Sequence, residues 1–157
     1  MTTTNGAPRG EAEAITLIHA TTVAIDGAAV VIRGAPGSGK SDLALRLIDR
    51  GAVLVADDQT ALRRQGASVR ASAPASIAGL LEARGLGVVT LPTVSDVAVR
   101  LVVDLVPPEL IERLPEAASE TLLGVTLPRL LLAPFESSAA AKLRLAVAAG
   151  AFQLARG

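Results

Sequence analysis

The chain has 157 residues, of which 50% are hydrophobic, and its formal net charge at pH 7 is zero. This length and composition predict one globular domain with a sizeable core rather than a disordered chain, and the neutral charge without a basic run argues against a nucleic-acid partner. Cysteine is absent, which excludes disulfides and thiol catalysis, and no segment has the pattern of a signal peptide or a membrane span, so we expect a cytoplasmic protein without a membrane partner.

The first third of the chain alternates short apolar runs with turn signals, which predicts strands, and then spaces apolar residues four apart, which predicts a helix. The predicted elements are strands at 15–18, 22–25 and 28–32 and a helix at 42–50. Asp26-Gly27 is a strong hairpin signal, so the second and third strands should pair antiparallel. Gly51 follows an Arg in the last turn and should end the helix.

The rest of the chain shows no repeat and no second domain, so we expect a flexible tail at residues 1–14 and a single domain at residues 15–157. Beyond the first helix we predict a strand at 52–56, a hairpin at 59–70 that turns at Gln65-Gly66, a short helix at 76–81, strands at 88–91 and 97–105, a brief helix between Pro107 and Pro115, a strand at 125–132, and a final helix from 137 or 138 to 155. Pro128 cannot donate to a sheet ladder, which predicts an edge position for its strand.

One segment matches the phosphate-binding pattern G-x-x-x-x-G-K-[ST]. Its residues are Gly34, Ala35, Pro36, Gly37, Ser38, Gly39, Lys40 and Ser41. The segment lies between a predicted buried strand and a predicted helix, where its glycines let backbone N–H groups point at phosphate oxygens. Lys40 would then reach the terminal phosphates and Ser41 would bind Mg²⁺. A chance match is disfavoured because Lys40 and Lys142 are the only two lysines in the chain.

Two carboxylates, Asp57 and Asp58, follow the predicted strand at 52–56. Phosphate-loop enzymes keep an acid on the Mg²⁺ side of the nucleotide at the end of such a strand. One helix connects the loop to this strand, and so short a connection predicts that the strand lies beside the phosphate-loop strand. The alternative is a solvated Asp pair at a strand–turn junction.

Taken together, these pieces resemble the catalytic domain of the HPr kinase/phosphorylase family. The matching segments are His19, Asp26-Gly27, Gly34–Ser41, Arg50-Gly51, Leu54–Asp58 and Leu81–Val89. The strand end Val-Ala-Asp-Asp and the segment Leu-Glu-x-Arg-Gly-Leu-Gly are specific, because other phosphate-loop families do not combine them. The resemblance implies an α/β fold: a P-loop-containing mixed β-sheet flanked by helices, the core of HPr kinase and PEP carboxykinase. It also resembles the short alphaproteobacterial form, without the family's usual amino-terminal domain.

The resemblance implies a serine kinase that uses ATP and Mg²⁺, phosphorylates an HPr-type phosphocarrier protein of a phosphotransferase system, and assembles as a hexamer. The residues that match the family's site are His19, Lys40 and Asp57 as catalytic residues, Ser41, Asp58 and Glu82 on the metal side, and Arg84 near the nucleotide. Asp57 would accept the proton of the substrate serine as it attacks the γ-phosphate. Without the resemblance, His19 reads as structural, and Glu82 with Arg84 as an exposed pair that ends a helix.

One departure from the family bears on activity. The family carries a basic loop with a catalytic Arg before its last helix, whereas residues 133–138 here contain Glu136 and no Arg. We therefore expect kinase activity with phosphorylase activity weak or missing.

Two alternatives to the protein kinase stay open. The first is a non-catalytic module that senses ATP or ADP; loss of the basic loop favours it and retention of Asp57 argues against it. The second is a small-molecule P-loop kinase, for which 157 residues leave little room for a lid and a substrate pocket.

Overall fold

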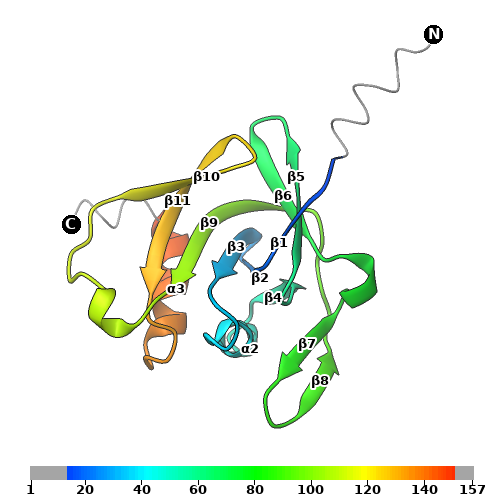
Figure 1. Cartoon of the computed structure of the whole chain (residues 1–157), viewed down its shortest axis with the longest axis horizontal. Helices are drawn as coiled ribbons and strands as arrows, with labels where there is room; N and C mark the ends of the chain where they lie inside the picture. Colours follow the sequence, from blue (N-terminus) through cyan, green and yellow to red (C-terminus); the bar gives the residue numbers. More distant parts are fainter. Residues whose placement is uncertain (1–13, 151–157) are drawn as a thin grey trace.

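The computed structural model describes residues 14–150, so most of the predicted tail at 1–14 and the predicted end of the last helix lie outside the described residues. Figure 1 labels the elements along the chain. The strands are β1 (Thr16–Ile18), β2 (Thr21–Ile25), β3 (Ala28–Arg33), β4 (Val53–Ala56), β5 (Thr60–Gln65), β6 (Ser68–Ser72), β7 (Leu80–Ala83), β8 (Gly87–Thr90), β9 (Val97–Leu105), β10 (Ala118–Leu122) and β11 (Val125–Leu132). The helices are α2 (Lys40–Asp49) and α3 (Ala139–Ala149), with single 3₁₀ turns η2 (Ala75–Ile77) and η3 (Pro108–Leu110).

A curled, mixed sheet forms the body of the molecule, which confirms the predicted α/β fold (Figure 1). Its main path runs β1-β5-β6-β9-β3-β2-β4. The long strand β9 pairs with β3 along one edge, while its other edge pairs first with β6 and then with β11. The sheet therefore divides at β9, and β10 extends the branch that begins with β11.

Three neighbouring strands, β3, β9 and β11, run parallel, so their carboxyl ends meet at one edge of the sheet. The chain leaves this edge by three segments: the phosphate loop after β3, residues 105–108 after β9, and residues 133–136 after β11. In open α/β sheets the crevice outside the carboxyl ends of parallel strands is where ligands bind. The topology thus gathers three loops around one candidate site.

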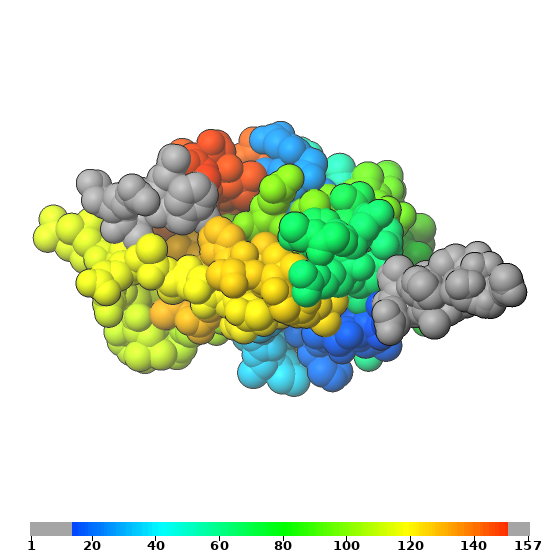
Figure 2. All heavy atoms as spheres, turned by 90° about the horizontal axis from the view of Figure 1, so that it is seen from above, coloured from blue at the N-terminus to red at the C-terminus, as the bar shows by residue number. Residues whose placement is uncertain are grey.

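The two faces of the sheet carry separate apolar cores, because successive side chains of a strand point to opposite faces. On β3, Val30 and Ile32 pack in the core covered by α2 and α3, while Ala29 and Val31 pack in the other. That second core is covered by strands rather than helices. The tips of the β5–β6 and β10–β11 hairpins meet there, with Arg64 Nη1 donating to Leu123 O at 3.2 Å (Figure 2). Within residues 14–150, no helix has the length and apolar character needed to cross a membrane.

Several predicted elements are confirmed at close to their predicted bounds. The Asp26-Gly27 hairpin joins β2 and β3, with Ile25 opposite Ala28. The hairpin that turns after Gln65 joins β5 and β6, and the strands predicted at 97–105 and 125–132 are β9 and β11. Helix α2 begins two residues earlier than predicted, at Lys40, because Gly39 in a left-handed conformation is its N-cap.

The predicted neighbour of the phosphate-loop strand is wrong. We expected the acidic strand β4 to lie beside β3, but β2 lies between them and pairs antiparallel with both. The reason is the tight hairpin, which places β2 against one edge of β3 before the chain reaches α2. The parallel neighbour of β3 is instead β9, far along the chain.

Two further predictions need correction, and one strand was missed. The helix predicted at 76–81 is one 3₁₀ turn followed by β7, which pairs with β8 in a hairpin whose turn is supplied by Gly85 and Gly87, both with positive φ. Strand β10 was not predicted; it pairs with residues 125–129 of β11. The strand with Pro128 is therefore not at an edge, and it tolerates proline because its pairing with β9 starts only at Arg129.

Candidate functional site

The phosphate loop turns sharply between β3 and α2. Gly37 and Gly39 have φ of 80° and 102°, conformations in which side chains are strained. Lys40, only 8% exposed, folds back so that Nζ donates to the carbonyls of Gly34 at 2.8 Å and Ala35 at 3.3 Å. The loop therefore holds a cation over its own backbone at the N-terminus of α2, where an anion is favoured.

A second loop, residues 133–138, packs against the phosphate loop. A Cβ on Gly39 would lie 2.9 Å from Cζ of Phe135, so the aromatic ring rests on the glycine itself. Arg46 of α2 holds this loop by donating to the backbone carbonyls of Pro134 and Glu136. The side chain of Glu136 pairs with Lys142 at 3.0 Å. No sequence pattern predicts the contacts of Arg46 and Phe135, because they join residues about 90 positions apart.

Asp57 is the best-connected carboxylate of the site. It is 7% exposed and accepts three hydrogen bonds: from Ser41 Oγ at 2.7 Å, from Thr21 Oγ1 at 2.9 Å and from the backbone N–H of Glu82 at 3.1 Å. These donors come from α2, β2 and β7, so one carboxylate ties the phosphate loop to two other elements. The predicted proximity of Asp57 and Ser41 is thus present, although a strand intervenes between β3 and β4.

Thr21 is a residue that the sequence did not single out. Its hydroxyl donates to Asp57 and also accepts the backbone N–H of Asp58 at 3.1 Å, and the side chain is fully buried. Asp58 has a φ of 70°, and Gln59 N donates to Asp57 O across it at 2.7 Å, which makes a tight γ-turn. This turn directs the exposed Asp58 side chain differently from its buried neighbour.

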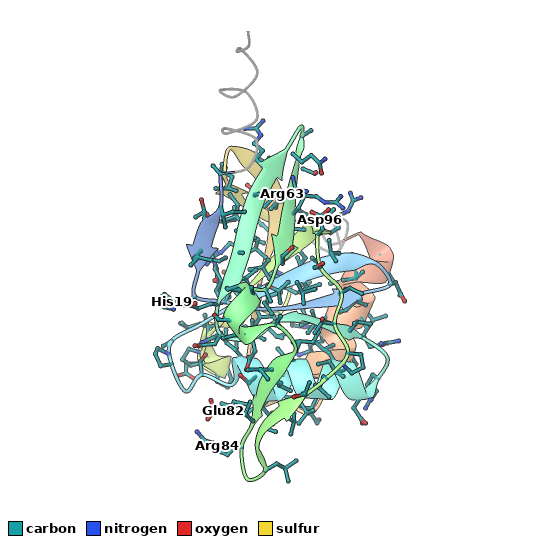
Figure 3. All side chains as sticks on the ribbon, turned by 90° about the vertical axis from the view of Figure 1, so that its right-hand side faces the viewer. His19, Arg63, Glu82, Arg84 and Asp96 are labelled. Atoms are coloured by element: carbon teal, nitrogen blue, oxygen red, sulfur yellow. The ribbon has the colours of Figure 1, made fainter. Side chains whose placement is uncertain are left out.

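A cleft of about 510 Å³ opens beside the phosphate loop. The residues that line it are Pro36, Gly37, Gly39, Lys40, Ser41, Asp42, Leu45, Asp58, Glu82, Ala83, Arg84 and Phe135. Glu82 and Arg84 lie on the β7–β8 hairpin, which projects from the body of the molecule (Figures 1 and 3). The structure therefore brings Lys40, Ser41 and Asp58 together with both hairpin residues.

Five of the predicted site residues lie outside this lining. Gly34, Ala35 and Ser38 are not on the cleft side of the loop, and Asp57 lies behind Ser41. His19, the only histidine, is exposed on the turn between β1 and β2. It lies on the same side of the molecule as Glu82 and Arg84 in Figure 3, two residues before the Thr21 that holds Asp57.

An ion-pair network holds the end of β3, directly before the phosphate loop, against β9 and β10. Arg33, the last residue of β3, makes a bidentate pair with Asp104 at 2.8 and 2.9 Å and also pairs with Glu120 at 2.8 Å. Arg129 donates to the same Asp104 carboxylate. Burial alone would raise the pKa of Asp104, but the hydrogen bonds from the two arginines outweigh it, so this pKa lies below its ordinary value. The hydrogen bond to Asp104 likewise raises the pKa of Arg33.

The donor set of the cleft suits a magnesium ion bound to phosphates. Residues 14–150 contain no group of three or more His, Cys, Asp or Glu side chains that would hold an ion alone. Mg²⁺ instead commonly binds one or two carboxylates, water and phosphate oxygens. Ser41 and Asp58 face the cleft beside Lys40, and the Ser41 hydroxyl donates its proton to Asp57, which leaves its oxygen lone pairs for an ion. The arrangement can therefore hold a polyphosphate with its cation.

Comparisons with known proteins match most of this chain to one group. The family model of the HPr Serine kinase C-terminal domain matches residues 12–154. An HPr kinase/phosphorylase of Geobacillus thermodenitrificans is 36% identical over 129 residues, which are 74% of this chain and 42% of that protein. One of Brevibacillus brevis is 44% identical over 79 residues, covering 50% of this chain and 25% of its own length. The chain thus spans less than half the length of these curated relatives.

A solved structure is also similar. The Hpr(Ser) kinase/phosphatase from Coxiella burnetii superposes with a TM-score of 0.77 and 28% sequence identity, covering 88% of this chain and 92% of that one.

Proposed function

The chain belongs to the HPr serine kinase C-terminal domain family, and from that premise we propose that it transfers the γ-phosphoryl group of ATP to a serine of an HPr-type phosphocarrier protein. The observation that carries the proposal is the hydrogen bond of 2.7 Å between Ser41 Oγ and Asp57 Oδ1. It joins the start of the phosphate-loop helix to a strand-end acid, which are the two parts that a phosphoryl-transfer site needs in contact.

The phosphates would lie in the cleft against the loop and the N-terminus of α2. Backbone N–H groups of the loop would bind the phosphate oxygens, and Lys40 would leave the loop carbonyls to contact the terminal phosphates. Ser41, Asp58 and Glu82 would hold Mg²⁺, which neutralises charge on the bridging oxygens when it is bound. Arg84 would offset charge on the transferring group.

Asp57 is proposed as the base. As the substrate serine oxygen forms its bond to the γ-phosphorus, the bond from that phosphorus to the bridging oxygen breaks and ADP leaves with the electron pair. The serine proton would go to Asp57, whose orientation is fixed by Thr21 and the N–H of Glu82. His19 is proposed to act at the substrate side of the site, because it is exposed on the strand turn next to these residues.

The experiment that tests this function is incubation of the chain with a purified HPr-type carrier, Mg²⁺ and ATP, followed by detection of phosphoserine. Asp57→Asn should lower transfer by about 10²–10⁴-fold, the usual contribution of a general base, while ATP binding persists. Lys40→Ala should weaken both binding and transfer.

Asp58→Asn is the matched control, since it changes the adjacent acid and Asn tolerates the same positive φ. It should raise the Mg²⁺ requirement without abolishing transfer. If Asp58→Asn abolishes transfer and Asp57→Asn does not, the base is misassigned. If the wild type binds ATP and never phosphorylates the carrier, the chain is a non-catalytic nucleotide-sensing module.

We propose that phosphorylase activity, the attack of inorganic phosphate on phosphoserine that releases serine and pyrophosphate, is weak or absent. The loop at 133–138 offers Glu136, which is paired with Lys142, and no arginine to bind the incoming phosphate. Rapid release of pyrophosphate from phosphoserine-carrier and inorganic phosphate would contradict this.

Assembly into a homo-oligomer, a hexamer by family resemblance, is proposed on the exposed large apolar side chains. These include Ile15, Leu17, Leu86, Val88 and Leu114. Burial of such side chains between subunits is a common reason for them to be exposed on one subunit. Light scattering on the purified chain measures the subunit number directly, and a monomer at all concentrations would refute the proposal.

A further inference from the structure

A second cavity lies on the other side of the phosphate loop, outside the carboxyl ends of β3, β9 and β11. It measures about 470 Å³. The residues that line it are Ala35, Ser38, Leu105, Val106, Pro107, Pro108, Ala133, Pro134, Phe135 and Glu136. Three segments contribute to it: the phosphate loop, residues 105–108 at the end of β9, and residues 133–136 after β11. Its position matches the crevice in which open α/β sheets bind ligands.

The lining of this pocket is almost wholly apolar. Apart from Ser38 and Glu136, every lining side chain is aliphatic, proline or aromatic, and Glu136 is already paired with Lys142. Ser38 Oγ is buried and has no hydrogen-bond partner among the described residues. An apolar cavity with a few convergent polar groups is typical of sites for the flat ring of a small molecule, and a buried hydroxyl without a partner is rare in native proteins.

Phe135 connects this pocket with the phosphate cleft. It lines both cavities, its ring rests on Gly39 of the loop, and it is 72% exposed although it is one of only two aromatic residues in the chain. Arg46 fixes the backbone on both sides of it. An aromatic ring held rigidly at the rim, with one face open, is suited to stack on a nucleobase.

We propose that the pocket binds the base of the nucleotide whose phosphates lie in the cleft, with Phe135 stacking on the base and Ser38 Oγ hydrogen-bonding to the nucleoside. The inference rests on the proposed function, because it needs a nucleotide on the phosphate loop. The inference gives a role in binding the base to Phe135 and to the segments at 105–108 and 133–136. The phosphate-binding pattern includes none of these residues.

The first test is calorimetry with ATP and with inorganic tripolyphosphate as separate titrants. Phe135→Ala should weaken ATP by about 10-fold or more, within the range found when a base loses its stacking partner, and leave tripolyphosphate unchanged. Lys40→Ala should weaken both ligands. Leu145→Ala is the matched control, because it removes an exposed apolar side chain, 65% accessible, from the far helix α3; it should change neither.

The outcomes separate the inference from the proposed function. If the wild type binds neither titrant, both fail. If Lys40→Ala weakens ATP while Phe135→Ala does not, the base lies elsewhere and only the inference fails. Equal weakening of ATP and tripolyphosphate by Phe135→Ala would show that the ring supports the loop instead, which also overturns the inference.

A second test uses the absence of tryptophan and tyrosine from the chain. Phe135→Trp makes a single fluorophore at the proposed stacking position, and Leu145→Trp makes one on α3. Stacking on a base should quench the first emission on addition of ATP and leave it unchanged with tripolyphosphate, while Leu145→Trp responds to neither. Identical responses of Phe135→Trp to both titrants would contradict a base at this position.

Discussion

The carboxylate of Asp57 shows how a single residue gains its place in the site. Both of its oxygens are hydrogen-bonded, and the donors belong to three different elements. The sequence predicted the acid itself, because a strand-end Asp after a phosphate loop is a recognisable pattern. It did not predict Thr21, since a buried threonine in a strand looks the same whether its hydroxyl bonds to a carboxylate of the site or to another threonine.

The first prediction concerns Thr21→Val. The change keeps the shape of a fully buried side chain but removes the hydroxyl that orients Asp57. We expect kcat for phosphoryl transfer to fall by about 10-fold, equivalent to about 1.4 kcal/mol, with little change in the Kd for ATP. Steady-state kinetics and calorimetry measure the two quantities.

The neighbouring strand residue supplies the control for Thr21. Thr22 is equally buried, but its hydroxyl bonds to Thr60 at 2.8 Å rather than to an acid. Thr22→Val should therefore lower stability without lowering kcat, and Thr21→Ser should recover most of the lost rate. Equal kcat values for Thr21→Val and Thr22→Val would rule out a positioning role.

At the scale of elements, the phosphate loop depends on two glycines for different reasons. Gly37 needs only its positive φ, since nothing lies within 4 Å of an added Cβ, whereas an added Cβ on Gly39 also meets Phe135. We expect Gly37→Ala to cost about 1–2 kcal/mol of unfolding free energy, and Gly39→Ala to cost distinctly more. Urea denaturation measures both losses.

A double variant tests the cause of that difference. Gly39→Ala combined with Phe135→Ala removes the clash but not the backbone strain, so part of the stability lost in Gly39→Ala should return. Additive losses would show that the aromatic contact does not contribute.

The ion pairs of Asp104, which join β3 and β9, predict that the unfolding free energy depends on pH. Because the folded-state pKa of Asp104 is lowered, its contribution to stability is present above its ordinary value of 3.8 and is lost as the pH falls through the folded pKa. Asp104→Asn should lower the unfolding free energy by about 2 kcal/mol at pH 7, the scale of hydrogen bonds to charged groups.

The difference between wild type and Asp104→Asn should then shrink below pH 3.8. Denaturant titrations at pH 7 and at the lowest pH at which both proteins stay folded measure it. A difference that is constant with pH would mean that the charge of Asp104 does not stabilise the fold.

Local signals explain which elements were predictable. The hairpin at Asp26-Gly27 and helix α2 follow from adjacent residues, and both were placed correctly. The helix predicted at 76–81 is wrong because Leu80 and Leu81 fit either pattern, and the pairing of Leu80–Ala83 with β8 decides in favour of a strand. Strand β10 has few buried side chains and forms through its pairing with β11, so its own residues carry little signal.

At the scale of the whole molecule, nucleotide binding should stabilise the fold by mass action. With Mg²⁺–ATP at 100 times its Kd, the unfolding free energy should rise by about 2.7 kcal/mol, which raises the Tm of a chain of this size by about 5–10 °C. Differential scanning fluorimetry measures the shift.

The two lysines of the chain provide a matched pair for that measurement. Lys40→Ala should abolish the shift, whereas Lys142→Ala, which removes an exposed lysine paired with Glu136, should keep it. A shift that survives in Lys40→Ala would place the nucleotide away from the phosphate loop.

The order of strands was the part of the whole fold that the sequence did not reveal. Which strand lies beside β3 depends on competition between a nearby partner and a distant one, and periodicity contains no information about that choice. The predicted proximity of Ser41 and Asp57 is nevertheless correct. Strand β4 is parallel to β3 with β2 between them, and the hydroxyl of Ser41 donates to Asp57.

The position of β2 between β3 and β4 has a consequence for how the protein acquires its structure. The β3-β2-β4 end of the sheet, helix α2 and the contact between Ser41 and Asp57 are all formed by one uninterrupted stretch from Thr21 to Asp57. Closing short loops costs little entropy, so contacts among these residues are able to form before the distant strands β9 and β11 arrive. We therefore expect the contact between Ser41 and Asp57 to form early in the folding reaction, and the apolar pocket, which needs the ends of β9 and β11, to form late.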